Sequence, residues 1–286
     1  MTTFATITIL HTKKFVRVRN HCQAHDAQNV VTQNHFTNHK NANNMQKLIF
    51  YTGAGMSRES GLPTFRGENG LWDTLDVEAV ADRSSWYCGR RSDRDNIRQQ
   101  MLDFFNPLRR LILEKEPNEG HRIIASLETD YEVTVITQNG DDYHTRAGSS
   151  NVIYLHGEAL KNASTLHPYE SYEIDRNNPD IHIGDKAPDG SQLRPYVIYF
   201  NEDIEQHLWK ASVEATKQAD AFIVVGSTML VYPAAELLNM LPPKCKLYII
   251  DPAEVSLPEG CDKEYTHIKS GATHGLQQLK ELLQFK

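Results

Sequence analysis

Five short clusters of glycine and polar residues follow runs of apolar residues in this sequence. Their residue types are suited to hold a phosphate, a ribose or an amide, and to move a proton. The clusters are Gly53-Ala54-Gly55, Gln138-Asn139-Gly140-Asp141, His156-Gly157, Gly226-Ser227-Thr228 and Asp251. Because the carboxyl ends of parallel strands line one crevice, we expect the five clusters to converge on a single ligand.

The first cluster belongs to the segment GAGMS, residues 53–57, whose small residues let backbone amides approach a pyrophosphate. A helix starting after it would add partial positive charge. The dehydrogenase fingerprint G-x-G-x-x-G fails because Arg58 occupies the third glycine position, so hydride transfer is disfavoured. A simple chain turn remains the alternative to phosphate binding. Asp251 is suited to accept hydrogen bonds from ribose hydroxyls, with a turn or capping role before Pro252 equally open.

Asn139 and Asp141 offer an amide and a carboxylate suited to a carboxamide and an ordered water, although Asn-Gly-Asp is also strong turn chemistry. His156 follows an apolar strand beside the other clusters, which favours a general base over a structural histidine. A neutral imidazole with a pKa of about 6.5 is a competent base for a sugar hydroxyl. We expect His144, on the turn after Asp141, to orient and pack.

The composition describes an ordinary soluble globular protein of 286 residues, 40% of them hydrophobic, with a net charge of -7. Nucleic acid is not an expected partner, because phosphate binding needs clustered positive charge. No apolar run approaches the roughly 20 residues that span a bilayer, so we place the protein in the cytoplasm and expect no membrane association. The cysteines never show C-x2-4-C spacing, so we expect no metal site; they are Cys22, Cys88, Cys245 and Cys261.

Residues 1–44 are rich in His, Asn and Gln, and we expect them to form a disordered extension before a catalytic domain at 45–286. From Met45 onward, apolar runs alternate with helical patterns, which predicts a Rossmann-like parallel sheet with helices on both faces. The predicted strands are KLIFYT, EVTVIT, NVIYL, AFIVV and KLYII, and the predicted helices include NEGHRIIASLET, YPAAELLNML and THGLQQLKELLQ.

Two insertions, at roughly 68–116 and 158–193, are predicted to form a smaller helical and loop-rich module. The helical stretch in the first insertion is expected to break at Pro107, which lacks an amide hydrogen. The second insertion is rich in Asn, Asp, Pro and Gly.

Five segments together resemble the sirtuins, in family order and over nearly the whole chain after Met45. They are GAGMSRESGLPTFRG, TQNGDDYHTRAGS, LHG, RPYVIYFNE and GSTMLVYPAA. The resemblance implies NAD as a consumed co-substrate bound between the sheet domain and the inserted module. It also implies removal of acyl groups from protein lysines, with nicotinamide and O-acyl-ADP-ribose as products.

The resemblance also implies roles for individual residues. His156 is the implied catalytic base, assisted by Asn139 and Asp141, and Phe65 covers the nicotinamide side. The other implied NAD contacts are Gly53, Ala54, Gly55, Ser57, Arg66, Gln138, Gly226, Ser227, Thr228, Asp251 and Ala272. The implied substrate contacts are Val197, Tyr199, Phe200, Asn201 and Glu202, on which an extended peptide would pair as on an edge strand.

The chain departs from the family pattern at several positions. Most sirtuins carry four zinc-binding cysteines after LHG and this chain has none there, so we expect no zinc and a module held by packing, in part through residues 185–190. Gly140 replaces a branched apolar residue and should loosen the nicotinamide pocket, while Asn201 replaces a glycine. The Tyr-x-x-Arg pair of desuccinylating relatives corresponds to Phe105 and Leu108, which predicts an apolar acyl pocket.

Two other functions remain open from the sequence. An NAD glycohydrolase or ADP-ribosyltransferase would share the whole NAD site, although RPYVIYFNE favours a peptide substrate. A non-catalytic NAD or ADP-ribose sensor is suggested by Gly140 and Asn201, but intact His156 and Asn139 oppose it. The oligomeric state and the protein substrate are not predicted.

Overall fold

A computed structural model of the chain describes residues 45–64, 76, 80–88, 91–228, 234–258 and 260–284. These residues belong to one compact unit, Asn41–Lys286. The extension predicted at residues 1–44 lies outside the described residues.

A six-stranded parallel sheet forms the centre of this unit, in the order β3-β2-β1-β7-β8-β9. Its strands are β1 (Lys47–Thr52), β2 (Glu132–Thr137), β3 (Val152–Tyr154), β7 (Ala221–Val225), β8 (Lys246–Ile250) and β9 (Tyr265–Ile268). The order runs outward in both directions from β1 and β7, as in doubly wound dinucleotide-binding folds. The predicted fold class and the five predicted strands are confirmed.

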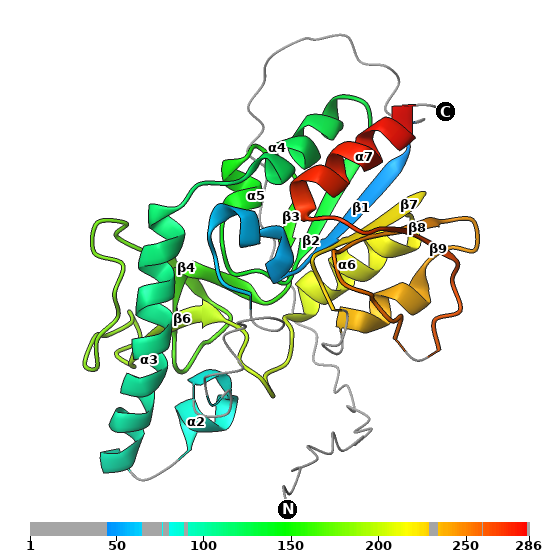
Figure 1. Cartoon of the computed structure of the whole chain (residues 1–286). Helices are drawn as coiled ribbons and strands as arrows, with labels where there is room; N and C mark the ends of the chain where they lie inside the picture. The colour runs from blue at the N-terminus through cyan, green and yellow to red at the C-terminus, as the bar shows by residue number, and fades with distance from the viewer. Residues whose placement is uncertain are drawn as a thin grey trace, which may run out of the picture. The chain divides into compact units, whose positions relative to one another are not determined.

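Helices cover both faces of this sheet (Figure 1). One face packs against α4 (Glu119–Ser126) and α7 (Ala272–Gln284), and the other against α6 (Gln206–Lys217) and the 3-10 helix η6 (Ala234–Met240). Successive strand residues point to opposite faces, so Leu48 and Phe50 enter the first core while Ile49 and Tyr51 enter the second. Burial on both faces explains why the strands are continuous apolar runs.

A smaller module lies beside the carboxyl ends of these strands (Figure 1). It contains α2 (Arg83–Tyr87), α3 (Arg91–Glu114) and an antiparallel sheet ordered β5-β4-β6. The strands of that sheet are β4 (Gly157–Ser164), β5 (Ser171–Glu173) and β6 (Leu193–Val197). Trp86, Met101 and Phe105 belong to its buried core. The second insertion is therefore not only loop: it includes most of a sheet whose pairing partners lie far apart in sequence.

Pro107 does not divide α3, contrary to the prediction from sequence. Burial of Met101, Leu102 and Phe105 holds the helix before the proline, and Ile112 is buried after it. The Asn106 side chain also exchanges two hydrogen bonds with the backbone of Ile181, at 2.9 and 3.0 Å. These tertiary contacts outweigh the one helical hydrogen bond that proline cannot make.

Other local predictions also differ from the structure. The segment after Gly53 forms two short 3-10 turns, η2 (Ala54–Met56) and η3 (Arg58–Ser60), instead of a helix start, and the chain leaves η3 through Gly61 at a left-handed φ of 95°. The segment YPAAELLNML contributes the 3-10 helix η6 instead of an α-helix. Two remaining elements are η5 (Leu127–Thr129) and the short helix α5 (Tyr143–Arg146).

Polar contacts tie the loops of the smaller module together. Ser164 Oγ donates to Asp189 and lies 2.9 Å from Ser191 Oγ. Gln192 Nε2 donates to His182 O at 2.8 Å. Arg194 and Glu202 form a 2.6 Å ion pair with side chains 0% and 3% exposed.

The described residues contain no group of three or more His, Cys, Asp or Glu side chains able to hold a metal ion.

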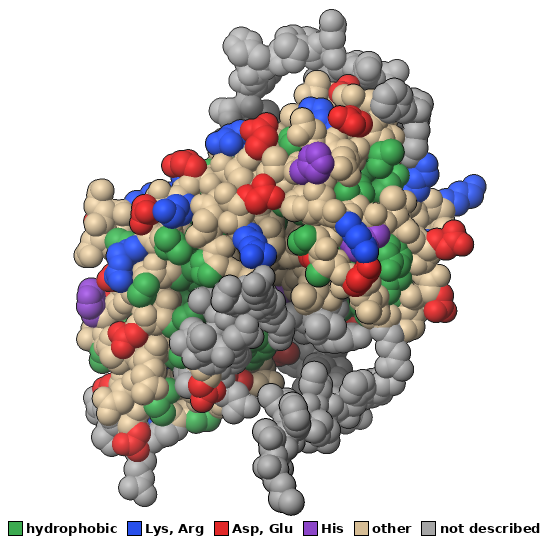
Figure 2. Space-filling view, in the orientation of Figure 1, with side chains coloured by type: hydrophobic (Ala, Val, Ile, Leu, Met, Phe, Trp, Pro, Cys, Tyr) green, Lys and Arg blue, Asp and Glu red, His purple; other side chains and the backbone are tan. Residues whose placement is uncertain are grey.

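The surface of the unit has no dominant charge on the face in Figure 2, where acidic and basic side chains are interspersed among the described residues. Within the same residues, no helix is both long enough and apolar enough to cross a bilayer.

We expect the smaller module to depend on the Arg194–Glu202 pair and not on a metal ion. Treatment with EDTA should leave the thermal unfolding temperature unchanged, whereas Arg194→Ala should lower the free energy of unfolding by about 3–5 kcal/mol, because it leaves a buried carboxylate unpaired. The control is Arg110→Ala, which removes an ion pair in which Arg110 is 51% exposed and should cost at most about 1 kcal/mol. A large loss of stability in EDTA would contradict this account.

Candidate functional site

A cavity of about 870 Å³ opens where the carboxyl ends of the parallel strands face the smaller module. Its lining includes at least one residue from each of the five clusters that the sequence singled out. From the smaller module, α3 and residues 197–202 complete the wall. The volume lies within the usual range for small-molecule sites, about 300–1,000 Å³.

Contacts between glycine backbones bring the turns after β1 and β7 together. Gly55 N donates to Gly226 O at 2.9 Å, and Gly226 N donates to Ile250 O at 3.0 Å. A Cβ on Gly226 would lie 2.5 Å from Gly55 Cα, and Gly226 has a φ of 59°. Only glycine fits this close approach, so Gly55 and Gly226 are constrained by packing as well as by any ligand.

A buried polar network lies behind the cavity wall. Asn139 Nδ2 donates to Gly53 O at 3.0 Å and to Ser57 Oγ at 3.2 Å, and Ser57 Oγ donates to Asp141 at 2.8 Å. Asn139 lines the cavity, whereas Ser57 and Asp141 support it from behind. Burial raises the pKa of Asp141 to about 6, and the hydrogen bond from Ser57 partly opposes that rise.

His156 lies at the crossing from β3 to β4, between the two sheets, and its half-buried side chain lines the cavity. Its backbone carbonyl accepts a hydrogen bond from Ile198 N at 2.9 Å, which fixes it against the smaller module. Desolvation lowers its pKa to about 4, and a hydrogen bond to the backbone of Gln138 partly opposes this shift. The imidazole is therefore neutral near pH 7 and able to accept a proton.

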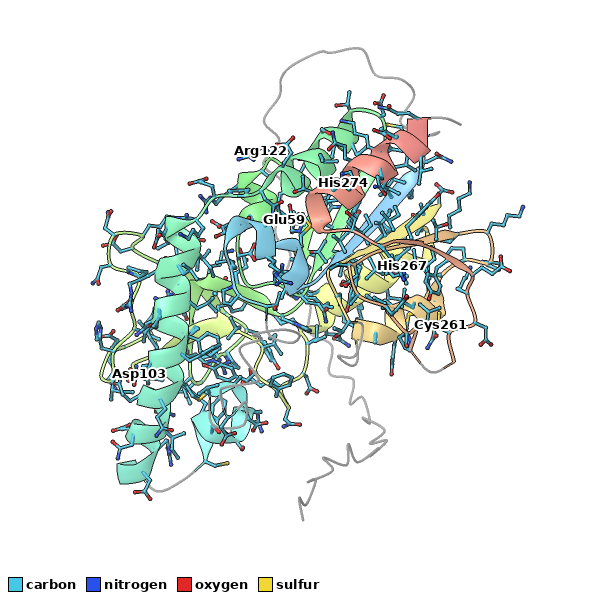
Figure 3. All side chains as sticks on the ribbon, in the orientation of Figure 1. Glu59, Asp103, Arg122, Cys261, His267 and His274 are labelled. Atoms are coloured by element: carbon cyan, nitrogen blue, oxygen red, sulfur yellow. The ribbon has the colours of Figure 1, made fainter. Side chains whose placement is uncertain are left out.

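A carboxylate and the start of α7 form another part of the cavity lining. Asp251 follows β8, its Oδ1 accepts from Ala253 N at 2.9 Å, and burial raises its pKa. Ser270, Gly271 and Ala272 line the cavity at the α7 N-terminus. This helix start, instead of the predicted one after Gly53, offers partial positive charge. Figure 3 shows Glu59 beside it, and Glu59 Oε1 accepts from Thr273 N at 3.1 Å.

The turn at residues 199–202 is fixed by contacts within the chain. Phe200 N donates to Ala81 O at 2.8 Å and Phe200 O accepts from Arg83 N at 2.9 Å, so neither group is free to pair with a peptide. Asn201 has a φ of 64°, a left-handed region that glycine adopts freely and asparagine tolerates, so asparagine can occupy the position where the sirtuin resemblance implies glycine. The Asn201 side chain donates to Asp82, which caps α2.

Gly140 approaches β4 closely instead of leaving an open space. Gly140 O accepts from Ala159 N at 2.7 Å, and a Cβ on Gly140 would lie 3.3 Å from Ala159 Cβ. The expected loosening of the pocket at Gly140 is therefore limited, because Ala159 packs against the space that a side chain would need.

An apolar wall from α3 lines the same cavity as His156. It contains Phe104, Phe105 and Leu108, and it is extended by Val197 at the end of β6 and by Tyr199 just after it. Arg109 does not line the cavity: its guanidinium is fully buried and donates to Asn162 Oδ1 at 2.7 Å.

The residues predicted from sequence are thus mostly brought together. Phe65 and Arg66 lie outside the described residues, so their predicted roles stay predictions. Several lining residues were missed: some lie inside the recognised segments but were given no role, and others lie in α3 and around Ala81, which carry no recognisable site motif. They are Arg58, Glu59, Thr64, Ala81, Phe104, Ile198, Ile204 and Ser270.

The comparisons with known proteins agree with this geometry. The Sir2 family description matches residues 53–233. An NAD-dependent protein deacylase of Bacteroides thetaiotaomicron is 40% identical over 242 residues, which cover 84% of this chain and 98% of that protein. An NAD-dependent protein deacylase of Helicobacter pylori is 39% identical over 237 residues, covering 82% and 96% of the two chains.

Solved structures show the same fold. A Sir2 homologue in complex with NAD superposes with a TM-score of 0.70 at 30% identity, covering 84% of this chain and 90% of that one. A Sir2 complex with a p53 peptide and NAD gives a TM-score of 0.66 at 26% identity, covering 85% and 96%. With this sheet order, this cavity and this similarity to known proteins, the chain belongs to the Sir2 family, the sirtuins.

Proposed function

We propose that residues 45–286 form an NAD-dependent protein-lysine deacylase that transfers the acyl group to ADP-ribose and releases nicotinamide. The observation that carries this proposal is one cavity whose lining combines a dinucleotide-type crevice, an apolar wall and His156. The curated relatives named as NAD-dependent protein deacylases support the same activity.

The residues of the crevice fit NAD. The small residues at Gly53–Gly55 and Gly226 let a pyrophosphate approach the backbone closely, while the amides of these three glycines donate within the fold. The α7 start adds a favourable dipole. Asp251 and Ser227 suit ribose hydroxyls, and Ser227 is held by a 2.9 Å hydrogen bond to Gln138 Oε1. When bound, NAD supplies an activated ribose carbon with nicotinamide as its leaving group.

His156 acts as the general base in this proposal. Its neutral imidazole faces the cavity, and the crossing between two sheets holds its backbone, so that the ring can take a proton from a ribose hydroxyl. Asn139 orients the carboxamide and an ordered water, and Asp141 supports Asn139 from behind the cavity wall. Ser57 couples these two side chains and fixes which way the Asn139 amide points.

A peptide substrate would pair beyond Phe200, because the Phe200 backbone groups are already used. Asn201 and Glu202 line the cavity mouth beside Ile204. Glu202 is fixed by Arg194 and by its own 2.8 Å hydrogen bond from Tyr199 N. Because Glu202 N donates to Tyr199 O at 3.0 Å, this rigid turn presents the Asn201 backbone and the Glu202 carbonyl to an extended chain.

The acyl group would pack against the apolar wall that α3 contributes to the cavity. Phe105 and Leu108 offer neither a hydroxyl nor a cation, and the neighbouring Arg109 guanidinium points to Asn162 instead of the cavity. An acidic acyl group would lose its hydration there without a partner, so acetyl or longer aliphatic groups are favoured over succinyl.

Replacing the general base tests the assignment of His156. His156→Ala should bind NAD with nearly unchanged affinity, measured by calorimetry, and should reduce kcat for deacetylation by roughly 10²–10⁴-fold, as expected for loss of a general base. Deacetylation at nearly the wild-type rate would show that another residue takes the proton.

The pH profile separates His156 from Asp141. A base works in its neutral form, and because the pKa of His156 is lowered to about 4, its protonation should not reduce kcat/KM above about pH 5. Asp141, with a pKa of about 6, should produce the acid limb.

Ser57→Ala removes a hydrogen bond that lowers the pKa of Asp141, so the acid limb should move to higher pH in that variant. The profile of kcat/KM for an acetyl peptide, measured for both proteins, checks this. A limb that stays in place in Ser57→Ala would contradict the assignment to Asp141.

The preference for acetyl over succinyl groups should depend on the side chains that α3 contributes to the cavity. The double variant Phe105→Tyr with Leu108→Arg adds a hydroxyl and a cation, and charge-assisted hydrogen bonds of about 1.5–3 kcal/mol should raise the succinyl-to-acetyl ratio of kcat/KM by about 10- to 100-fold. The matched control is Phe105→Tyr alone, which should change the ratio little. Wild-type turnover of succinyl-lysine equal to that of acetyl-lysine would contradict the apolar pocket.

A further inference from the structure

Two buried histidines lie next to each other behind the cavity wall. His121 is on α4 and His144 is on α5, both are 0% exposed, and their ring centroids are 4.8 Å apart at 66°. Neither lines the cavity. Each ring has one nitrogen with a hydrogen-bond partner, while His121 Nε2 and His144 Nδ1 have none among the described residues.

The partner of His121 fixes its tautomer. Asn118 N donates to His121 Nδ1 at 3.2 Å, as part of the capping box that starts α4. Nδ1 therefore carries the lone pair, and a neutral ring must carry its proton on Nε2. Burial and the neighbouring His144 lower the pKa of His121 to about 2, so the ring is neutral.

The partner of His144 fixes its tautomer in the same way. Thr52 Oγ1 donates its one proton to Thr137 Oγ1 at 2.9 Å, so it presents a lone pair to His144 Nε2 at 3.0 Å. His144 must then carry its proton on Nε2 and a lone pair on Nδ1. Burial lowers the pKa of His144 to about 3, which again keeps the ring neutral.

The two groups without partners are complementary, because one is an N–H donor and the other is a lone pair. We infer that His121 Nε2–H is linked to His144 Nδ1 through one bridging water, and that both histidines are positioning residues for Asn139. A single directed chain of hydrogen bonds then runs from the first turn of α4 through His121, His144 and Thr52 to Thr137.

Both ends of this chain reach the turns that form the cavity wall. Thr137 Oγ1 accepts from Asn139 N at 3.1 Å, directly beside the amide that faces the cavity. At the other end, Asn118 Nδ2 donates to Met56 O at 2.8 Å, which holds the turn after β1. The start of α4 thus sets the spacing between the two turns without touching a ligand. The kinetic test of this positioning role rests on the proposed function, whereas the test of the histidine tautomers does not.

The tautomers can be measured directly. In the full chain labelled with 15N-histidine, long-range 1H–15N spectra should place the proton of both rings on Nε2 and show no titration of either between pH 5 and 8. His121→Asn and His144→Gln identify the two signals. A ring protonated on Nδ1, or one that titrates in this range, would overturn the inference.

Kinetics test the positioning role. His144→Leu removes both hydrogen bonds of the His144 ring and should lower kcat for deacetylation. The loss should be at most on the order of 10²-fold, as expected when the Asn139 side chain is displaced by about 1 Å. The KM for the peptide should not change. His144→Gln can still donate to Thr52 and should recover part of that loss. The control His207→Leu, on an exposed ring, should leave kcat unchanged.

The positioning role of the two histidines and the deacylase activity of the protein would fail in different ways. Equal kcat in His144→Leu and wild type, with only a lower unfolding temperature, would show that the pair is merely structural. A wild-type protein with no deacylation would count against the proposed function, while the tautomer measurement would still decide the histidine pair.

Discussion

The contact between the glycine turns after β1 and β7 is the constraint on which the rest of the site depends. These strands are neighbours at the centre of the sheet, and the strand order runs outward from them in both directions. A side chain on Gly226 would lie 2.5 Å from Gly55 Cα, so any other residue would force the two turns apart. Because the turns meet here, the crevice above them is bounded by backbone that can approach a ligand closely.

The smaller module completes the site because the chain crosses to it twice at this edge of the sheet. The first crossing leads from the turn after β1 to α2 and α3, and the second leads from β3 through His156 into β4. His156 is therefore held by two sheets at once, and its backbone carbonyl bonds to Ile198 across the junction. The Arg194–Glu202 pair fixes the far side of the same junction, so binding surfaces for the cofactor and for a substrate are set by one framework.

Much of the sheet was predictable from sequence because its strands are apolar runs that end in glycine or polar turns. The side-chain partners were not predictable, since they depend on spacing across the fold: Ser57 with Asp141 and Asn201 with Asp82 are examples. Pro107 was misread because tertiary burial outweighs a local preference. Helix α6 was not identified, although Leu208, Trp209 and Val213 repeat at helical spacing toward the core.

The cavity geometry implies that ADP-ribose accepts the acyl group. The reaction products identify the acceptor. Mass spectrometry of the products formed by the purified protein with NAD, with and without an acetyl-lysine peptide, measures this directly. The account predicts O-acetyl-ADP-ribose, nicotinamide and a peptide with an unmodified lysine side chain, and it predicts them only when the acetyl-lysine peptide is present. ADP-ribose released at the same rate without peptide would contradict it and would identify an NAD glycohydrolase instead.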